Sequence, residues 1–324
     1  MDTEAKIKLF LLDNVVWLIC IGLYILFSFL VPRGFLQLHN IEFILYTSSM
    51  IGLLVFGQSL ALISGNLDLS LAQNTGLSAM ITGYILGIAY PNTPGWIGII
   101  MIIIVGAMLG SINGILIGRI GFNAFLATLA TYLVFDWSTF WIRRGAIVNL
   151  PKSFLAVGEM TVGGIHISIF IFIIVAICLH FLLSKTKFGN WIYATGDNPN
   201  TTRMMGVDIG LVDFYVFTIA GALAGLSGLL YIGYIGCVTS LIAQGMIFNA
   251  FAGAIIGGVS LKGGKGGIIG AFGGVLMLGI LEAGLTMLKI NPELRGVLSG
   301  IVLGLAILIN IKVEQTRERI LMPH

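Results

Sequence analysis

Residues 95–118 read GWIGIIMIIIVGAMLGSINGILIG and contain no Asp, Glu, Lys or Arg. About 20 predominantly apolar residues suffice for a helix to cross the hydrocarbon core of a bilayer, so this stretch predicts a transmembrane helix. Gly106, Gly110, Gly114 and Gly118 recur every four residues and fall on one helical face. Small residues at this spacing let helix backbones approach closely in lipid. We therefore expect this face to pack against another helix. The same spacing recurs at Gly296, Gly300 and Gly304.

Apolar stretches of this kind repeat along the whole chain and predict an all-α, polytopic membrane protein. Hydrophobic residues make up 57% of the 324 residues and charged residues only 10%, whereas soluble proteins carry about 25% charged residues. The mean hydropathy is +1.03. A soluble enzyme, a nucleic-acid binder and a disordered scaffold are therefore excluded as first interpretations. Ten stretches are predicted to span the membrane, at about 14–31, 41–64, 70–90, 95–118, 123–142, 165–183, 211–232, 247–260, 267–288 and 294–311.

The distribution of basic residues predicts the orientation of these ten spans. An even number of spans places both termini on one side. With that side inside, 11 of the 17 Lys and Arg residues fall in inner segments and 6 in outer segments. The positive-inside rule favours this N-in/C-in arrangement, although Arg143 and Arg144 then lie outside. The longest inner polar segment runs from Ser184 to about Gly210, and no linker or soluble domain is apparent, so residues 1–324 are expected to form one transmembrane domain.

The two halves of the chain resemble each other weakly at an offset of about 170 residues. Glu42-Phe43 before Tyr46-Thr47 corresponds to Asp213-Phe214 before Phe217-Thr218. Because the offset covers five helices, spans two to five and spans seven to ten would enter the membrane in opposite directions. Inverted repeats recur in transporters, with the solute pathway at the repeat interface. A chance alignment of glycine-rich apolar segments is the alternative.

Polar side chains interrupt the apolar stretches and are candidates for a solute pathway or gate. The candidates are Asn66, Asp68, Asn74, Asn113, Asn123, Thr128, Asn249 and Glu282. Neutral amides and hydroxyls suit an uncharged polyhydroxylated solute because they donate and accept hydrogen bonds without trapping a charge. Each residue could instead link two helices. No Lys, Arg or His lies at an obvious partner spacing from Glu282, which argues against a proton-driven carrier.

Asp68 permits two interpretations. It lies in residues 65–70 (GNLDLS), between the second and third spans. An Asp in this position can accept hydrogen bonds from the first amides of the following helix as an N-cap. A carboxylate near membrane depth is also costly and often functional, and Asp68 could help form an inner gate.

No pattern in the sequence predicts catalysis. Residues 262–267 (KGGKGG) do not form a phosphate-binding loop, because Gly266 follows the lysine where Ser or Thr is required. The four His residues and three Cys residues are scattered and match no metal-ligand spacing. We therefore expect no catalytic residue, metal or cofactor, and any ATP hydrolysis would belong to a separate subunit.

Four segments in order resemble the signatures of bacterial ABC-importer permeases of the ribose (monosaccharide) type. They are residues 65–70 (GNLDLS), 122–129 (FNAFLATL), 186–207 (TKFGNWIYATGDNPNTTRMMGV) and 256–266 (IGGVSLKGGKG). The resemblance covers roughly residues 40–311. Asn66 stands where the family usually has Gly, Asn190 replaces a basic residue, and Asp197 replaces Gly.

The resemblance implies a permease subunit of a bacterial inner membrane that works with several partners. These are a second permease copy or paralogue, cytoplasmic ATP-binding subunits and an extracytoplasmic solute-binding protein. The inner segment 184–210 is the expected docking surface for the ATP-binding subunit, with Gly189 and Gly196 allowing tight turns and Arg203 donating to a partner carboxylate. The expected coupling residues are Lys187, Phe188, Gly189, Gly196, Asp197, Asn198, Arg203 and Gly206.

The leading hypothesis is thus ATP-driven uptake of a monosaccharide or a similar small polyol. The same architecture could import a nucleoside or an amino acid instead. A self-sufficient channel or secondary carrier is the alternative of a different class.

Overall fold

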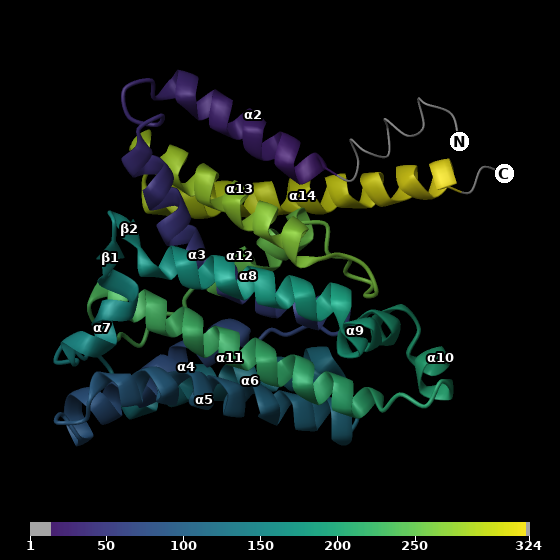
Figure 1. Cartoon of the computed structure of the whole chain (residues 1–324), viewed down its shortest axis with the longest axis horizontal. Coiled ribbons are helices and arrows are strands. Elements are labelled where there is room, and N and C mark those ends of the chain that lie inside the picture. The colour runs from purple at the N-terminus through teal and green to yellow at the C-terminus, as the bar shows by residue number, and fades with distance from the viewer. Residues whose placement is uncertain (1–13, 322–324) are drawn as a thin grey trace.

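The computed structural model describes residues 14–321, and this part of the chain is mostly helical (Figure 1). Residues 1–13 and 322–324 of the predicted single domain lie outside it. The helices are α2 Val15–Leu30, α3 Leu38–Ile63, α4 Leu71–Tyr84, α5 Gly95–Gly114, α6 Ala124–Ile142, α7 Lys152–Glu159, α8 Ile167–Lys185, α9 Lys187–Asp197, α10 Pro199–Met204, α11 Ile209–Ile235, α12 Met246–Ile256, α13 Ile268–Met287 and α14 Pro292–Leu321. Two π-helical turns, η1 Ile85–Ala89 and η2 Ile115–Arg119, continue α4 and α5.

Each of the ten predicted stretches coincides with a helix. Six helices of the described chain are long and apolar enough to cross a membrane, namely α3, α5 with η2, α6, α8, α11 and α13. The helices at the other four stretches are α2, α4 with η1, α12 and α14. The shortest is α12, whose 11 residues extend only about 16 Å at 1.5 Å per residue. That is roughly half of a bilayer's hydrocarbon thickness of about 30 Å.

Short elements gather at the two ends of the long helices (Figure 1). At one end lie α9 and α10, together with the first residues of α2 and the last of α14. At the other end lie α7 and a small hairpin in which β1 (Thr161–Val162) pairs antiparallel with β2 (Ile165–His166). Gly163 and Gly164 form its turn with φ of 62° and 84°, a conformation that glycine adopts without strain.

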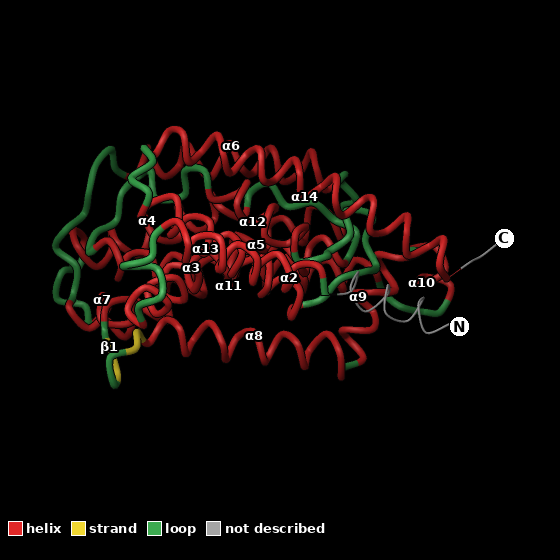
Figure 2. The backbone as a smooth tube through the Cα atoms, turned by 90° about the horizontal axis from the view of Figure 1, so that it is seen from above, coloured by secondary structure: helices red, strands yellow, loops and turns green. Residues whose placement is uncertain are grey.

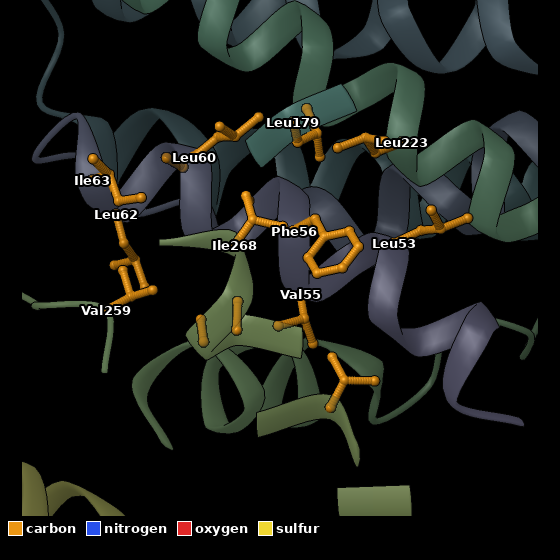
Figure 3. Packing of buried hydrophobic residues seen from close by; sticks show 14 of the residues in the cluster. Leu53, Val55, Phe56, Leu60, Leu62, Ile63, Leu179, Leu223, Val259 and Ile268 are labelled. Atoms are coloured by element: carbon orange, nitrogen blue, oxygen red, sulfur yellow. The ribbon is translucent and has the colours of Figure 1, made fainter. Parts of the chain in front are cut away.

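The core of the molecule surrounds α3, whose middle and C-terminal half is almost fully enclosed (Figure 3). Phe56 on α3 stacks on Phe172 of α8 with ring centroids 5.1 Å apart. Phe172 also stacks on Phe272 of α13 at 5.0 Å. Gly52 provides the space for the Phe172 ring, because a Cβ there would overlap with it. The outer face of α8 is left at one edge of the molecule (Figure 2), where Ile174 and Ile177 are exposed.

The glycine face of α5 packs against α11 as its spacing predicts. A Cβ at Gly106, Gly110 or Gly118 would overlap with a backbone carbonyl oxygen of α11. One at Gly114 would lie 2.8 Å from the Cα of Phe214. Backbone contact of this closeness is what small residues permit between helices in lipid.

The glycine face of α14 is bare by contrast. Among the described residues, nothing lies within 4 Å of a Cβ built at Gly296, Gly300 or Gly304. The same spacing therefore marks a packed face in α5 and an open face in α14.

Candidate functional site

A cavity of about 750 Å³ opens between α3, α11, α12, α13 and α14 and the loop that precedes α12. Its wall combines aliphatic side chains with polar groups, among them Asn249 of the short helix α12 and Glu282 of α13. These are two of the eight predicted pathway residues. A second cavity, of about 490 Å³, lies between α2, α12, α13 and α14 and is lined mainly by aliphatic side chains. The first cavity is therefore the better candidate for a polar solute.

An ion pair forms part of the wall of the larger cavity. Arg295 Nη1 lies 2.6 Å from Glu282 Oε1 and donates a second hydrogen bond of 2.6 Å to Thr286 Oγ1. The Arg295 side chain is 21% exposed and that of Glu282 is 56% exposed. No basic residue lies at a helical spacing from Glu282, but the turn between α13 and α14 brings Arg295 against it. The pair gives the cavity charged hydrogen-bonding groups without a net charge.

Two polar residues that we had not predicted also belong to this region. Ser48 lines the cavity, is 1% exposed, and its hydroxyl has no hydrogen-bond partner among the described residues. Gln58 is fully buried, and within residues 14–321 neither its amide oxygen nor its nitrogen has a partner. Gln58 follows the cavity residue Ile51 by seven positions, or two helical turns, and so shares its face of α3. An amide within the apolar stretch 51–63 is the signal that could have identified it.

An apolar cluster adjoins the cavity on the side of Gln58. Leu54 of α3, Leu71 of α4 and Ala220 of α11 pack there with Met246 and Ile247 of α12. Met246 also lines the cavity, so the cluster and the cavity share a wall. Leu54 is one turn further along α3 than the cavity residue Ile51, so the cluster contacts α3 nearer to its C-terminal end.

The other predicted pathway residues lie away from the cavity, and two of them belong to one hydrogen-bonded chain. Thr131 Oγ1 donates to Asn113 Oδ1 (2.8 Å), and Asn113 Nδ2 donates to Ser70 Oγ (2.7 Å). Ser70 in turn donates to Asp68 Oδ1 through both its hydroxyl (2.7 Å) and its backbone N–H (2.8 Å). All four residues are buried. This series of hydrogen bonds joins α6 and α5 to the start of α4.

The remaining four predicted pathway residues also have local partners. Asn66 Nδ2 donates to Asp213 Oδ1 of α11 at 2.7 Å. Asn74 Nδ2 donates to the carbonyl of Gly106 at 3.0 Å. Asn123 caps α6 by accepting from Leu126 N, and Thr128 donates to the carbonyls of Leu67 and Ala124. Asn66, which departs from the family pattern, thus has a definite contact.

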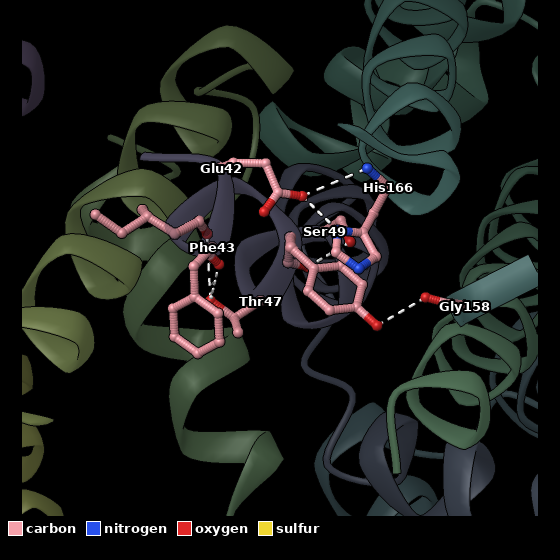
Figure 4. Close-up of polar contacts among 8 residues, drawn as sticks. Glu42, Phe43, Thr47, Ser49, Gly158 and His166 are labelled. Carbon is pink, nitrogen blue, oxygen red and sulfur yellow. Dashed lines mark hydrogen bonds and ion pairs between the residues drawn. The ribbon is translucent and has the colours of Figure 1, made fainter. Parts of the chain in front are cut away.

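A polar cluster fastens the end of the molecule that carries the β-hairpin (Figure 4). His166 Nδ1 contacts Glu42 Oε1 of α3, and the imidazole stacks on the Tyr46 ring with centroids 3.7 Å apart. Tyr46 Oη donates to the carbonyl of Gly158 in α7 at 2.7 Å. The cluster therefore joins α3, α7 and the start of α8.

The predicted coupling residues lie at the opposite end, on α9 and α10 and in the loops at Asn198 and Gly206. Asn198 caps α10 by accepting from Thr201 N at 3.0 Å, and Gly206 ends that segment with φ of 82°. Gly189 and Gly196 do not form the tight turns expected of them. Both are helical residues of α9, and a Cβ on either would overlap with a backbone carbonyl oxygen of α8 or α3.

The charged and apolar groups of α9 and α10 face outward. Lys187, Asp197 and Arg203 are exposed, whereas Phe188 packs edge-on against Tyr215 of α11. Exposed apolar side chains lie beside them at Trp191 (43%), Met204 (89%) and Met205 (76%). Tyr193 lies on the partly buried face of α9, and this burial raises the pKa of its phenol above the ordinary value. Exposed methionines next to charges are typical of a protein-binding surface.

Most of the chain matches the model of a known protein family. Residues 40–307 match the model of the family described as branched-chain amino acid transport system / permease component. No solved structure matches the chain significantly.

Three curated relatives from Escherichia coli match the chain over most of their length. The D-allose transport system permease protein AlsC of strain K12 is 33% identical over 277 residues, which cover 85% of this chain and 84% of AlsC. The ribose import permease protein RbsC of the same strain is 27% identical over 284 residues, covering 86% and 88%. The autoinducer 2 import system permease protein LsrC of strain O9:H4 is 29% identical over 288 residues, covering 89% and 83%.

Proposed function

The chain belongs to the branched-chain amino acid transport system / permease component family, and from this premise we propose that it is the transmembrane subunit of an ATP-driven importer for a monosaccharide or a similar small polyol. It is a multi-pass inner-membrane protein. The observation that carries the proposal is the polar-walled cavity among the helices, with Asn249, Glu282 and Arg295 in its wall. Polar groups at membrane depth are costly unless they serve a path or a contact.

The chemistry of the cavity favours an uncharged, hydroxylated solute. The Glu282–Arg295 pair offers an acceptor and a donor side by side, and the Ser48 hydroxyl lacks a partner within the described chain. Vicinal hydroxyls satisfy such groups without bringing a charge. The names of the relatives AlsC, RbsC and LsrC refer to D-allose, ribose and autoinducer 2, which agrees with this class.

Transport would proceed by alternating access past the apolar cluster. In this scheme, Leu54, Met246 and their neighbours would separate the cavity from the Gln58 side of α3, because Met246 belongs both to the cluster and to the cavity wall. Opening the cluster would expose to the solute the Gln58 amide, which has no hydrogen-bond partner within residues 14–321. Gln58 would then be the next polar side chain that the solute contacts after the cavity, nearer to the inner end of α3.

We propose ten spans in one transmembrane domain, with both termini inside. The difficult case is the eighth span, since α12 is too short to cross. The loop before it contributes the rest, because Val238 pairs with Ile147 near the end that carries α7, whereas Gly264, after α12, bonds to Ile63 beside α9. The chain therefore passes from one end of the molecule to the other between residues 238 and 264. Broken helices of this kind are common beside transporter solute sites.

The paired helix lengths support an inverted repeat of α3–α6 and α11–α14. The first helices of the two units have 26 and 27 residues, the second ones 14 and 11, and the third ones 20 each. The fourth helices differ, with 19 residues in α6 and 30 in α14. Glu42 and Asp213, which correspond in the sequence, lie near the starts of α3 and α11, at opposite ends of the molecule. Each carboxylate contacts another segment. Glu42 Oε1 contacts His166 Nδ1, and Asp213 Oδ1 accepts a hydrogen bond from Asn66 Nδ2.

Three surfaces suit the three proposed partners. The exposed residues of α9 and α10, including Arg203 and Met204, would bind a cytoplasmic ATP-binding subunit, which would hydrolyse ATP. The glycine face of α14 would pack against a second permease subunit. The loop and helix before α8, residues 143–166, would face the solute-binding protein on the outside.

Reconstitution tests the proposal. The purified chain in liposomes, alone and with its ATP-binding subunits and solute-binding protein, is assayed for uptake of radiolabelled D-ribose, D-allose, L-leucine and uridine. We expect no uptake by the chain alone and ATP-dependent uptake of a sugar by the complex. Uptake by the chain alone would identify a channel or secondary carrier. ATP-dependent uptake of leucine or uridine, but not sugars, would overturn the solute class.

A further inference from the structure

Three glycine-rich segments, far apart in the sequence, meet at the inner end of the molecule. Gly65 follows α3, Gly196 lies in the last turn of α9, and Gly263 and Gly264 lie between α12 and α13. Gly264 N donates to the carbonyl of Ile63 at 2.9 Å. Each segment belongs to a different one of the signature stretches recognised in the sequence.

The backbones at this meeting point leave no room for side chains. A Cβ at Gly196 would overlap with the Ile63 carbonyl oxygen and lie 2.6 Å from Gly264 N. A Cβ at Gly263 would lie 2.6 Å from the Gly196 oxygen and 2.9 Å from the Gly65 Cα. Gly65, Gly263 and Gly264 also have positive φ values of 85°, 86° and 69°, which favour glycine.

A hydrogen bond closes the arrangement on one side. Tyr193, one helical turn before Gly196 in α9, donates from its hydroxyl to the carbonyl of Gly266 at 2.8 Å. It is partly buried. Gly267, the next residue, marks the edge of the contact, because the nearest atom to a Cβ there is the Tyr193 hydroxyl at 3.9 Å.

We propose that Gly65, Gly196, Gly263, Gly264 and Tyr193 form a joint that transmits displacement of α9 to two separate limbs, α3–α4 and α12–α13. The inference rests on the proposed function, in which α9 receives the movement of the ATP-binding subunit. Contacts between backbones have no side-chain rotamers to absorb a displacement, so α9 and the two loops move together.

The limbs that meet at the joint carry part of the cavity wall. Ser48 lies on α3, Asn249 on α12 and Glu282 on α13. A displacement of α9 would therefore reach both sides of the solute cavity at once. Gly196 and Tyr193 are positioning residues in this scheme, since neither lines the cavity.

Hydrogen exchange of the purified full-length chain in lipid nanodiscs tests the joint without any partner. Gly196→Ala should speed amide exchange about tenfold in residues 60–68 and in residues 258–268, because both segments lose their contact with α9. Tyr193→Phe removes one hydrogen bond, worth about 1 kcal/mol, and should speed exchange about fivefold in residues 258–268 alone. Gly22→Ala and Gly267→Ala, where a Cβ has no close neighbour, should change neither segment.

Faster exchange confined to α9 in the Gly196→Ala chain would overturn the joint. If that variant does not fold, Tyr193→Phe decides: unchanged exchange in residues 258–268 would be the overturning result.

A second arm tests transmission in the complex with the ATP-binding subunits. Spin labels at Asn190 of α9 and Lys262 of the α12–α13 loop, both exposed, are placed in a chain without its native cysteines. The mean distance between the two labels should be the same before and after addition of ATP and vanadate. The distribution of this distance should become broader in the Tyr193→Phe variant. A change of this distance in the unsubstituted joint would overturn rigid transmission. Failure of an ATP-binding subunit to bind the chain would contradict the proposed function, and the exchange experiment would still decide the joint.

Discussion

Glu282 and Arg295 illustrate what a single residue contributes to the cavity. The two are 13 positions apart and lie on different helices, so no helical spacing relates them, and their contact depends on the turn between α13 and α14. The position of Glu282 in an apolar stretch predicted a functional role but not its partner. Asp68 shows the opposite case. The N-cap residue of α4 is Ser70 rather than Asp68. Asp68 accepts a local hydrogen bond from Ser70 N, whereas the hydrogen bonds that continue through Asn113 to Thr131 join distant segments and could not be predicted locally.

Replacing Glu282 with Gln tests the residue scale. The substitution keeps the volume but leaves Arg295 without an opposite charge, so the cavity wall becomes positive and loses a strong acceptor. Sugar uptake by the reconstituted complex should fall roughly three- to tenfold, as loss of one hydrogen bond of about 1 kcal/mol implies. Because the carboxylate is half exposed, the loss of stability should stay below about 1 kcal/mol.

The matched control is Glu293→Gln, an exposed residue in the first turn of α14 that does not line the cavity. Uptake and membrane abundance are measured for both variants. Equal uptake by both would show that Glu282 plays no part in solute handling.

At the scale of elements, the amino-acid pattern was most informative where it concerned one helix and its apolar face. All ten predicted stretches coincide with helices, and the glycine spacing of α5 correctly predicted a packed face. The same spacing in α14 lies on an open face, because a local pattern carries no information on which surface covers it. Gln58 could have been selected as an amide in an apolar stretch, whereas the position of Ser48 on the cavity wall depends on how α3 packs against the other helices.

Gly110→Ala tests the packing of α5 on α11. Its Cβ would overlap with the carbonyl oxygen of Phe217, so the two helices must separate. Overpacking of this kind costs about 1–3 kcal/mol, and the melting temperature of the purified chain in detergent should fall by several degrees. Gly22→Ala in α2, where a Cβ meets nothing within 4 Å among the described residues, provides the control. Equal melting temperatures for Gly110→Ala and the unsubstituted chain would contradict backbone packing at this site.

The whole molecule shows how distant segments combine into a transporter subunit. Three signature segments converge at the glycine contact beside α9, and α3, α12 and α13, which lead from that contact, form part of the cavity wall. Their resemblance to a family was evident from the sequence, but their convergence depends on the turn geometry at Gly65, Gly263 and Gly264. The proposed eighth span also depends on loop geometry. The loop before α12, rather than the hydropathy of α12 itself, completes that span.

The bare face of α14 leads to a prediction about assembly. Gly296 and Gly300 border the larger cavity, so a second subunit on this face would also complete the wall of that cavity. Gly300→Leu should then lower the dimer fraction of the chain in nanodiscs, measured by single-molecule photobleaching, without lowering its melting temperature, because the residue has no neighbour within the described chain. Gly22→Leu on the exposed part of α2 should leave the dimer fraction unchanged. A dimer unaffected by Gly300→Leu would place the interface elsewhere, and an unsubstituted chain that remains monomeric would require a paralogue as the partner on this face.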